Sequence, residues 1–274
     1  MILDQITEAT RIRVRRAKEI LPLQELKEQI QENRQNINLS VRGASSFRYA
    51  LKKEGMSFLC EVKKASPSKG IITEDFPYLQ IAKEYEEAGA QAISVLTEPE
   101  FFLGSNRYLS AISREVSIPV LRKDFTVDEY QLYEAKAIGA NAVLLICTLL
   151  TEEEIRHFLT VCDTLDLAAL VETHTEEEVS MAVRAGAGII GVNNRNLATF
   201  EVDLRTSIHL RDKVPGNIIY VAESGIRTPE DVLMLKNAGV DAVLIGEILM
   251  RSVNKAEMLA KLRGEEGGYG KHKN

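Results

Sequence analysis

The sequence predicts an α/β protein, a closed (β/α)8 or TIM barrel with an N-terminal helical extension, and three observations support this prediction. From residue 58 onward, eight short apolar runs alternate with longer amphipathic stretches. Most of the runs are apolar along their whole length, as are parallel strands that are buried on both faces. No change in composition marks a second domain, which favours a single barrel over two units.

Residues 1–45 stand outside this alternation and predict one or two helices, interrupted near Pro22. Five basic residues crowd into the first of them: Arg11, Arg13, Arg15, Arg16 and Lys18. A solvated helix face would explain this cluster. A helix over one mouth of the barrel would also explain it, because positive charge there would help to draw in an anionic substrate.

The barrel is expected over 46–263, and a flexible tail is expected over 264–274. The eight strands are predicted at 58–62, 92–96, 119–123, 142–146, 168–172, 189–193, 218–222 and 242–246. Helix-start signals lie between the strands. These signals are the capping-box spacings of Thr151 with Glu154 and of Thr175 with Glu178, and an N-cap before proline at Thr228-Pro229.

A weak internal repeat supports the count of strands. Short glycine-centred motifs at 88–90, 138–140, 185–187 and 238–240 each end a helical pattern and lead directly into a strand. Glycine just after a helix can adopt a positive φ, so the chain turns back tightly toward the sheet. A GxGxxG nucleotide fingerprint is absent from the sequence, which again favours a closed barrel over a doubly wound open sheet.

Charge and cysteine content exclude several classes of function. The 274 residues carry 34 Lys and Arg against 40 Asp and Glu, a net charge of −6, whereas a nucleic-acid binder needs a basic face. The three cysteines form no CxxC pair, so we expect a reducing cytoplasm and no disulfide framework. No signal peptide or membrane-spanning run is expected. Metal-ligand spacings such as HxH or HExxH do not occur, and no metal is predicted.

Polar side chains gather where the predicted strands end. The carboxyl ends of barrel strands face the reaction site, so these side chains are expected to meet at one mouth. Burying charges together costs free energy unless they neutralise one another, and core positions do not need them. The set comprises Glu61, Lys63, Thr97, Glu98, Lys123, Asp124, Glu172, Asn193, Arg195, Glu223 and Ser224. Two lysines and four glutamates at one mouth predict a catalytic site.

Two stretches have the character of an oxyanion site. Ser224-Gly225 follows the seventh strand and Gly246-Glu247 follows the eighth, where many barrels bind phosphate with backbone N–H groups. We therefore expect a phosphorylated substrate. A small hydroxyl residue would suit a dianion better than Glu247 does, so we expect the Glu247 amide to face the anion and its carboxylate to face away.

Six blocks of sequence resemble the indole-3-glycerol phosphate synthase family in order and spacing, over essentially the whole chain. The blocks are EVKKASPSKG (61–70), LTE with FFLG (96–98 and 101–104), PVLRKDF (119–125), VETH (171–174), GVNNRNL (191–197) and AESGI (222–226). The resemblance implies an enzyme that converts 1-(2-carboxyphenylamino)-1-deoxyribulose 5-phosphate to indole-3-glycerol phosphate in tryptophan biosynthesis. Carbon dioxide and water are lost, and neither a metal nor an organic cofactor takes part.

The resemblance also implies roles for individual residues. Lys123 matches the family's general acid, Glu172 its general base and Lys63 a second lysine that engages substrate anions. The positions that orient the lysines and bind sugar hydroxyls match Glu61, Asn193 and Glu223. The contacts near the anthranilate carboxylate match Arg195 and Ser66. The apolar slot for the aromatic ring is expected from Phe102, Leu121, Phe125, Leu144 and Leu197.

Other interpretations use the same residues. A class I aldolase-like enzyme would form a Schiff base on Lys63 or Lys123. Phosphoribosyl anthranilate isomerase shares the phosphate loops but not the Glu61-Val62-Lys63 block, and a non-catalytic scaffold subunit would only bind a phosphate sugar. His174 follows Glu172 at a strand end, where support of Glu172 is one interpretation, but no role is assigned to it. The sequence leaves open whether a pathway enzyme docks on this chain.

Overall fold

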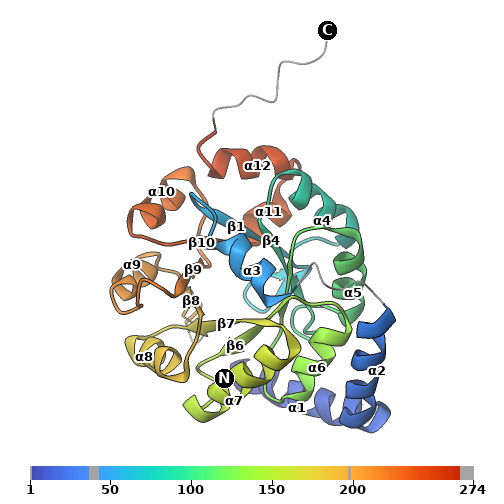
Figure 1. Ribbon diagram of the computed structural model, residues 1–274. Coiled ribbons are helices and arrows are strands. Elements are labelled where there is room, and N and C mark those ends of the chain that lie inside the picture. The colour runs from blue at the N-terminus through green and yellow to red at the C-terminus, as the bar shows by residue number, and fades with distance from the viewer. Residues whose placement is uncertain (1, 37–42, 197–198, 266–274) are drawn as a thin grey trace.

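The computed structural model describes residues 2–36, 43–196 and 199–265. Eight parallel strands close into a barrel in the order β1, β10, β9, β8, β7, β6, β5, β4, as Figure 1 shows. Their bounds are β1 Ser57–Val62, β4 Ala92–Leu96, β5 Val120–Lys123, β6 Ala142–Ile146, β7 Ala168–Thr173, β8 Ile189–Asn193, β9 Ile219–Glu223 and β10 Ala242–Ile245. All eight predicted strands are therefore confirmed, each end within one residue.

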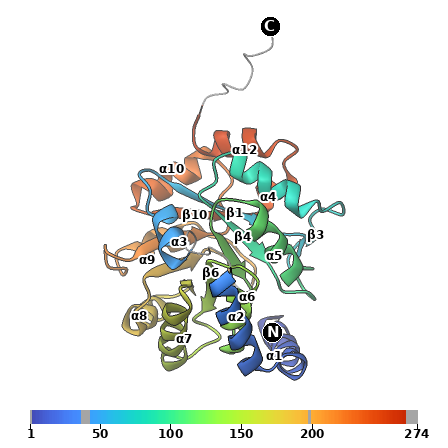
Figure 2. The ribbon, with the colours of Figure 1, turned by 45° about the vertical axis from the view of Figure 1, so that its right-hand side comes forward.

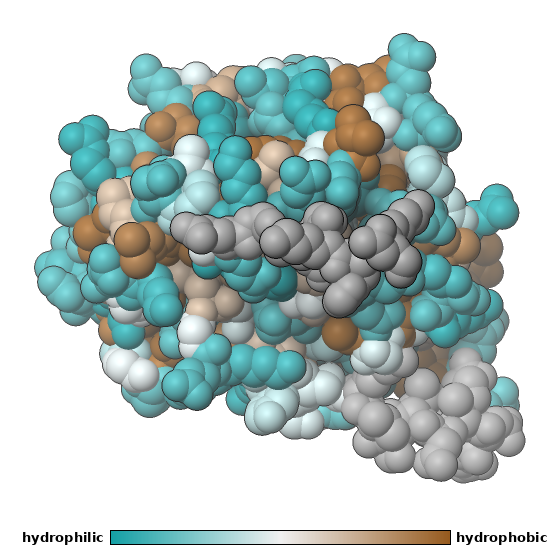
Figure 3. Space-filling model, turned by 90° about the horizontal axis from the view of Figure 1, so that it is seen from above, coloured by the Kyte–Doolittle hydropathy of each residue, from teal (hydrophilic) through white to brown (hydrophobic). Residues whose placement is uncertain are grey.

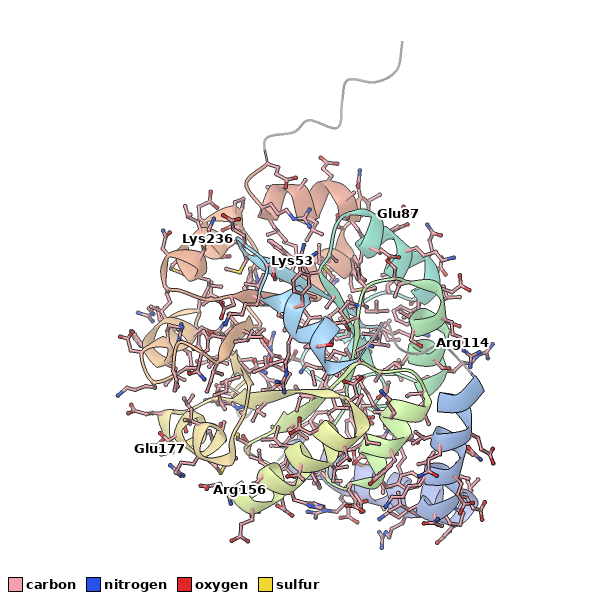
Figure 4. The ribbon with its side chains drawn as sticks, in the orientation of Figure 1. Lys53, Glu87, Arg114, Arg156, Glu177 and Lys236 are labelled. Carbon is pink, nitrogen blue, oxygen red and sulfur yellow. The ribbon has the colours of Figure 1, made fainter. Side chains whose placement is uncertain are left out.

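Helices cover the outside of the barrel (Figure 1). They are α4 Tyr78–Glu87, α5 Asn106–Glu115, α6 Tyr130–Ala137, α7 Glu152–Leu165, α8 Glu176–Ala185, α9 Arg205–Arg211, α10 Pro229–Asn237 and α12 Lys255–Leu262. Charged side chains on these helices, such as Glu87, Arg114 and Arg156, point away from the barrel (Figure 4). The opposite faces of the helices bury apolar residues against the strands, as an amphipathic helix must.

Side chains alternate between the two faces of each strand, and this alternation positions the site. Along β1, Phe58, Cys60 and Val62 pack under the outer helices. Leu59 belongs to a second apolar cluster inside the barrel. Glu61, two residues further on, therefore faces the same interior just beyond that cluster and lines a cavity.

The predicted helix starts are present, with one departure. Thr151 and Glu154 form a complete capping box at α7, and Thr228 caps α10 with proline in its first turn. Thr175 caps α8 by accepting a hydrogen bond from the Glu178 amide. The Glu178 carboxylate, however, accepts from the His174 amide at 2.6 Å. The spacing of Thr175 and Glu178 could not reveal that the Glu178 carboxylate binds the His174 amide instead of the Thr175 amide.

The four glycine-centred turns are also present. Gly89, Gly139, Gly186 and Gly239 have φ values between 80° and 95°, a conformation that L side chains rarely adopt. Each of these glycines ends a helix and lets the chain enter the next strand at once. The weak repeat in the sequence is thus a repeated backbone geometry.

Helix α3 (Ala44–Leu51) is not among the predicted elements. It lies across one end of the barrel (Figure 1), where Phe47 and Leu51 are fully buried. Both side chains join the interior cluster that contains Leu59 and Leu121. The helix therefore closes the end of the barrel opposite the strand carboxyl termini. A short hairpin of β2 (Ala65–Ser66) and β3 (Gly70–Ile71) follows β1 and was not predicted either.

The extension before the barrel contains α1 (Ile2–Ile20) and α2 (Leu23–Asn36), which are separated near Pro22 as expected. Helix α2 packs against α6, and Figures 1 and 2 both show the two side by side. The Tyr130 hydroxyl, at the start of α6, donates to the carbonyls of Ala17 and Leu21 at 3.3 and 3.0 Å. These contacts fasten the turn between α1 and α2 to the barrel.

Two residues of the basic cluster on α1 are used for attachment. Arg13 donates to both carboxylate oxygens of Asp124 at 3.0 and 2.6 Å, and Lys18 pairs with Asp128 at 2.7 Å. Their charges are neutralised by these partners, so they add little to a field that would attract an anion. The division into an extension at 1–45 and a barrel at 46–263 stays a prediction.

The surface, the cysteines and the chain end add four observations. Hydrophilic side chains dominate the face in Figure 3, with hydrophobic ones scattered among them. No helix in the described ranges has both the length and the apolar character needed to cross a membrane. Cys60, Cys147 and Cys162 are all free and buried. Of the predicted tail at 264–274, only Gly264 and Glu265 fall within the described residues.

Candidate active site

A cavity of about 340 Å³ opens at the carboxyl ends of the barrel strands. Nearly all predicted site residues line it, from eight strand ends and the loops that follow them. They are Glu61, Lys63, Ser66, Phe102, Lys123, Phe125, Leu144, Glu172, Asn193, Arg195, Glu223, Ser224, Gly225, Gly246 and Glu247. The closed barrel thus brings together residues that are far apart in the sequence.

Two of the residues expected to contact substrate, Leu121 and Leu197, are not found in this lining, and neither are Thr97 and Glu98 of the polar strand-end set. Leu121 is fully buried in the interior cluster and packs below the cavity. It precedes Lys123 by two positions on β5, so both side chains face inward, but Leu121 lies one layer deeper. Leu197 falls outside the described residues. A contact of either residue with substrate stays a prediction.

Lys123 lies at the centre of the charged groups. Its Nζ donates to Glu172 Oε2 at 3.0 Å and lies 3.5 Å from Glu223 Oε2. Burial acts to lower the pKa of Lys123, but Glu172 and the further acidic groups of Glu223 and Glu61 more than offset it, and the pKa is raised above its ordinary value. The Lys123 side chain is therefore held as an ammonium.

Glu172 and Glu223 have opposite ionisation despite similar burial. Burial acts to raise the pKa of Glu172, but Lys123 and His174 outweigh it and hold the carboxyl ionised, with its pKa well below the ordinary value. Asn193 Nδ2 also donates to Glu172 Oε1 at 3.2 Å. For Glu223, burial raises the pKa to about 8, and the partial compensation by Lys123 is opposed by the neighbouring carboxylates. One carboxylate and one protonated acid thus flank the same ammonium.

The Glu223 carboxyl occupies a space that a glycine keeps open. Its Oε1 is buried and has no hydrogen-bond partner among the described residues. A Cβ atom on Gly191, in the neighbouring strand β8, would lie 2.3 Å from that oxygen. Any larger residue at 191 would displace the carboxyl, so this glycine is needed for the site geometry.

Lys63 and Glu61 form a second charged pair in the cavity. Lys63 Nζ lies 2.5 Å from Glu61 Oε1, and both side chains are largely buried. A Cβ atom on Gly246 would lie 2.5 Å from the same Glu61 oxygen. The bare backbone at Gly246 therefore makes room for Glu61.

Apolar side chains form one wall of the cavity. The Phe102 and Phe125 rings are tilted by 40°, and their centroids lie 5.9 Å apart. The loop that carries Phe102 is held by Glu98, whose carboxylate accepts from the backbone amides of Glu100, Phe101 and Phe102 at 2.9, 2.7 and 3.0 Å. The position of Glu98 was noted in the sequence, but its loop-holding role became visible only in the fold.

The N-terminal helix supplies a part of the lining that sequence reasoning missed. Ile2, Leu3 and Ile6 of α1 reach the cavity. The sequence indicated only that a basic helix could lie over one mouth of the barrel, and it did not identify these three residues. Arg227 and Arg251 also line the cavity and were missed. Each lies a few residues beyond a predicted phosphate stretch, so closeness in sequence to these stretches was the available signal.

Strained backbone marks the predicted anion site. Ser224 has φ 67° and Gly225 has φ 86°, so two consecutive residues are left-handed. A Cβ on Gly225 would lie 2.4 Å from Val202 Cγ1, which allows only glycine there. Gly246 is the N-cap of α11 (Glu247–Arg251). The Glu247 carboxylate lies 3.5 Å from Arg251 Nε, and the expectation that it faces away from an anion stays a prediction.

Arg195 is oriented by its neighbours after β8. Its backbone amide donates to Asn193 Oδ1 at 3.0 Å, and its Nη1 donates to the Phe200 carbonyl at 3.3 Å. Asn193 therefore joins Glu172 on one side to the Arg195 loop on the other. Within the described ranges, no group of three His, Cys, Asp or Glu side chains is arranged to hold a metal ion.

Comparisons with solved structures support the fold. The chain resembles 3-hexulose-6-phosphate synthase from Salmonella typhimurium, with a TM-score of 0.63 and 13% identity over 77% of this chain and 98% of the other. It also resembles thiamine phosphate pyrophosphorylase from Pyrococcus furiosus, with a TM-score of 0.58 and 18% identity over 78% and 96%. At such low identity, these likenesses show the TIM-barrel fold alone.

Sequence comparisons are more specific. The family model for indole-3-glycerol phosphate synthase matches residues 3–262. The chain is 53% identical to indole-3-glycerol phosphate synthase of Ruminiclostridium cellulolyticum over 96% of this chain and 99% of the other. It is 49% identical to that of Lacticaseibacillus casei, with the same coverage. This chain belongs to the indole-3-glycerol phosphate synthase family.

Proposed function

We propose that Lys123 and Glu172 are the general acid and general base with which this chain converts 1-(2-carboxyphenylamino)-1-deoxyribulose 5-phosphate to indole-3-glycerol phosphate. The activity is that of a decarboxylating lyase of tryptophan biosynthesis, as its family membership implies. The observation that carries the assignment of roles is the ammonium of Lys123, 3.0 Å from Glu172 and 3.5 Å from Glu223 in one cavity.

The first step needs an acid. When the ring carbon that bears the carboxylate attacks the ribulosyl carbonyl, an alkoxide develops on the carbonyl oxygen. Lys123 is an ammonium because the surrounding acidic groups raise its pKa. An alkoxide is far more basic than an amine, so the proton passes from Lys123 to the substrate oxygen. Loss of CO2 then restores the aromatic ring.

The second step needs a base, and proton donation by Lys123 makes that base stronger. The positive charge of Lys123 is one of the causes that keep the pKa of Glu172 low. After Lys123 has given up its proton, that cause disappears and the proton affinity of Glu172 rises. Glu172 then accepts the carbon-bound proton, while Lys63 helps hydroxide to leave as water. Glu172 can return its proton to Lys123 across their 3.0 Å contact.

The remaining groups bind and orient the substrate. Glu61, Asn193 and Glu223 hold the lysines and the sugar hydroxyls, which keeps flexible ammonium groups at reaction distance. Arg195 and Ser66 receive the anthranilate carboxylate, for which a guanidinium fork is well suited. The ring enters the slot between Phe102, Phe125 and Leu144, with Leu121 and Leu197 as further predicted contacts. The phosphate is received by the backbone at Ser224, Gly225, Gly246 and Glu247.

A Schiff-base mechanism is less well supported. An imine forms only when a neutral amine attacks the substrate carbonyl. The pKa of Lys123 is raised by its carboxylate neighbours, so its neutral form is scarce. Borohydride treatment in the presence of substrate should leave Lys63 and Lys123 unmodified, and a covalent lysine adduct would favour the aldolase-like alternative.

Three further parts of the proposal concern the domain division, the cellular compartment and the substrate. Residues 1–45 act as an extension packed on a barrel of 46–263, and the Arg13 contact with Asp124 supports this division. The enzyme works in a reducing cytoplasm, which its free, buried cysteines support. The substrate is a phosphorylated anilino-sugar, and neither a nucleic acid nor a membrane is needed.

Turnover of Lys123→Ala tests the central assignment. Purified protein is given the carboxyphenylamino substrate with a chelator present, and indole fluorescence is followed. We expect product from the wild type, and a fall in turnover of at least roughly a hundredfold in the variant, the usual scale for a positioned acid. Substrate binding should be largely kept. Wild-type turnover in Lys123→Ala would overturn the assignment, and no product from the wild type would overturn the function.

A further inference from the structure

His174 follows β7 directly and lies behind Glu172. Its Nε2 is 3.6 Å from Glu172 Oε1, and its Nδ1 is 3.4 Å from Glu178 Oε2. Both ring nitrogens are buried, and neither makes a hydrogen bond of good geometry with another described residue. The imidazole therefore lies between two carboxylates, on the side of Glu172 away from Lys123.

The chemistry of these partners determines the protonation of the ring. A neutral imidazole has one donor and one acceptor nitrogen, whereas an ionised carboxylate can only accept. Since both nitrogens of His174 face carboxylate oxygens, only the imidazolium, with an N–H on each side, matches its surroundings.

The Glu178 carboxylate binds His174 instead of the Thr175 amide that the sequence predicts as its partner. Its spacing from Thr175 predicts that its carboxylate caps the Thr175 amide. Its Oε2 accepts instead from the His174 amide at 2.6 Å, and its Oε1 accepts from the Thr148 hydroxyl at 2.7 Å. In α7, by contrast, the corresponding Glu154 carboxylate does accept from its N-cap amide at 2.8 Å. Glu178 is thus held in place as a fixed negative partner for His174.

All charged groups that face His174 favour its protonated form. They are the carboxylates of Glu172 on β7 and Glu178 on α8, whereas Glu223 on β9 is a protonated acid. Burial acts to lower the pKa of His174, but these two carboxylates more than offset it and raise the pKa above the ordinary value of histidine. Among the described residues, the nearby cation is Lys123, which pairs with the other oxygen of Glu172.

We propose that His174, held by Glu178, is a positioning residue that keeps Glu172 ionised and oriented toward Lys123. The proposal rests on the assignment of Glu172 as the base. Glu172 Oε2 is engaged by Lys123, while Oε1 lies between Asn193 and His174. Cations on opposite sides therefore hold the carboxylate in one rotamer. When Lys123 gives up its proton, the charge of His174 remains, so Glu172 stays an ionised base until substrate supplies its proton.

The activity test uses His174→Gln, which is neutral at every pH. Without the imidazolium, the pKa of Glu172 rises, and the acid limb of the kcat profile should move up by about one pH unit. The ratio of variant to wild-type kcat should therefore fall as the pH is lowered. His157→Gln, which removes an exposed histidine paired with Glu129, is the matched control and should leave the profile unchanged. A ratio that is constant over pH would overturn the proposal.

A second measurement does not depend on turnover. NMR titration of the full-length protein follows the ring signals of its four histidines, and the spectrum of His174→Gln assigns the signal of His174. We expect His174 to titrate above the ordinary histidine value in the wild type. Glu178→Gln should lower that pKa by about one unit, because a charge at 3.4 Å is lost. Glu154→Gln removes a capping glutamate far from His174 and should leave its pKa unchanged.

The outcomes separate this proposal from the assignment of Glu172. If Glu172→Gln keeps wild-type turnover, the base assignment is wrong. If Glu172→Gln is inactive while His174 titrates at or below the ordinary histidine value, the base assignment stands and the role of His174 is refuted. If His174 had a merely structural role, His174→Gln would lower the free energy of unfolding without shifting the acid limb of the kcat profile. Glu178→Gln would then leave the pKa of His174 unchanged.

Discussion

Glycine at position 191 is the residue on β8 that faces the Glu223 carboxyl. The free space beside Oε1 is too small for a methyl group, since a Cβ would lie 2.3 Å away. Glu223 has no room to retreat because it is buried, and its other oxygen lies 3.5 Å from Lys123. Even the addition of one methyl group at Gly191 would therefore displace Glu223 and disturb its contact with Lys123.

Gly191→Ala should damage both stability and turnover. Overpacking a buried site costs about 1–3 kcal/mol. Displacing Glu223 by part of an ångström moves Lys123 from its place, for which a loss of roughly a hundredfold in kcat is expected. Gly216→Ala is the matched control, because nothing lies within 4 Å of its added Cβ. Chemical unfolding and steady-state kinetics measure both effects, and equal behaviour of the two variants would contradict the prediction.

The proton on Glu223 gives a distinct pH dependence of stability. The folded-state pKa is raised from 4.5 to about 8, mainly by burial. Folded protein thus keeps a proton that the unfolded chain releases once the pH exceeds 4.5. The stabilisation from this group is complete below that value and is lost as the pH rises to about 8.

Glu223→Gln removes this dependence because glutamine does not titrate. The free energy of unfolding of the wild type, relative to that of the variant, should fall between about pH 5 and pH 8. Urea titrations of both proteins at several pH values measure the difference. A difference that is independent of pH would show that Glu223 is ionised in the folded protein.

Helix α1 is fastened to the barrel by one buried contact near the site. Asp124, directly after the proposed general acid Lys123, accepts hydrogen bonds from both terminal guanidinium nitrogens of Arg13. The Thr97 hydroxyl and Arg122 donate to the same carboxylate at 2.6 and 3.2 Å. The Asp124 carboxylate therefore links helix α1 to the end of β5. Movement of α1 is expected to reach Lys123 through it.

Arg13→Met should loosen α1 with little change in side-chain length. Asp124 keeps Arg122 and Thr97 but loses two charge-assisted hydrogen bonds, so we expect a cost of about 1–3 kcal/mol. Hydrogen exchange in α1 should speed up, and kcat/KM should fall. Arg15→Met removes a neighbouring guanidinium whose partner Glu8 lies in the same helix and is exposed, and it should change stability little. Equal exchange rates in the two variants would contradict the prediction.

The closed barrel explains how one cavity gathers groups from the whole chain. Strand β1 pairs with β4 on one side and with β10 on the other, so the first and last strands are neighbours. The carboxyl ends of all eight strands therefore surround one opening. Helix α3 closes the opposite end, and α1 supplies Ile2, Leu3 and Ile6 to the open one.

A chain that begins at Gly43 tests the proposed division into extension and barrel. It keeps α3, whose first amide donates to Asp166, and every strand of the barrel. We expect far-UV circular dichroism typical of a barrel, a lowered Tm and a loss of at least about tenfold in kcat/KM, because the cavity loses its α1 wall. Full activity would show that the extension is not part of the working site. Loss of the fold would show that 46–263 is not an independent unit.

The strands, most outer helices and the list of strand-end residues were predictable because their signals are local. Apolar runs, capping pairs and glycine turns depend on residues a few positions apart. Helix α3 was missed because its eight residues follow no strand signal, and its burial depends on the barrel that it closes. Arg227 and Arg251 were missed because their approach to the cavity depends on loops and on the fold.

Local pattern thus established the barrel, its open end and the chemical types of the groups that meet there. It could not establish which carboxyl carries the proton. Glu172 and Glu223 are the same residue type at equivalent strand ends, yet Lys123, His174 and Asn193 hold one ionised while burial keeps the other protonated. Those differences arise from distances of a few ångströms between residues that are remote in sequence, because desolvation and Coulomb interactions act through space and not along the chain.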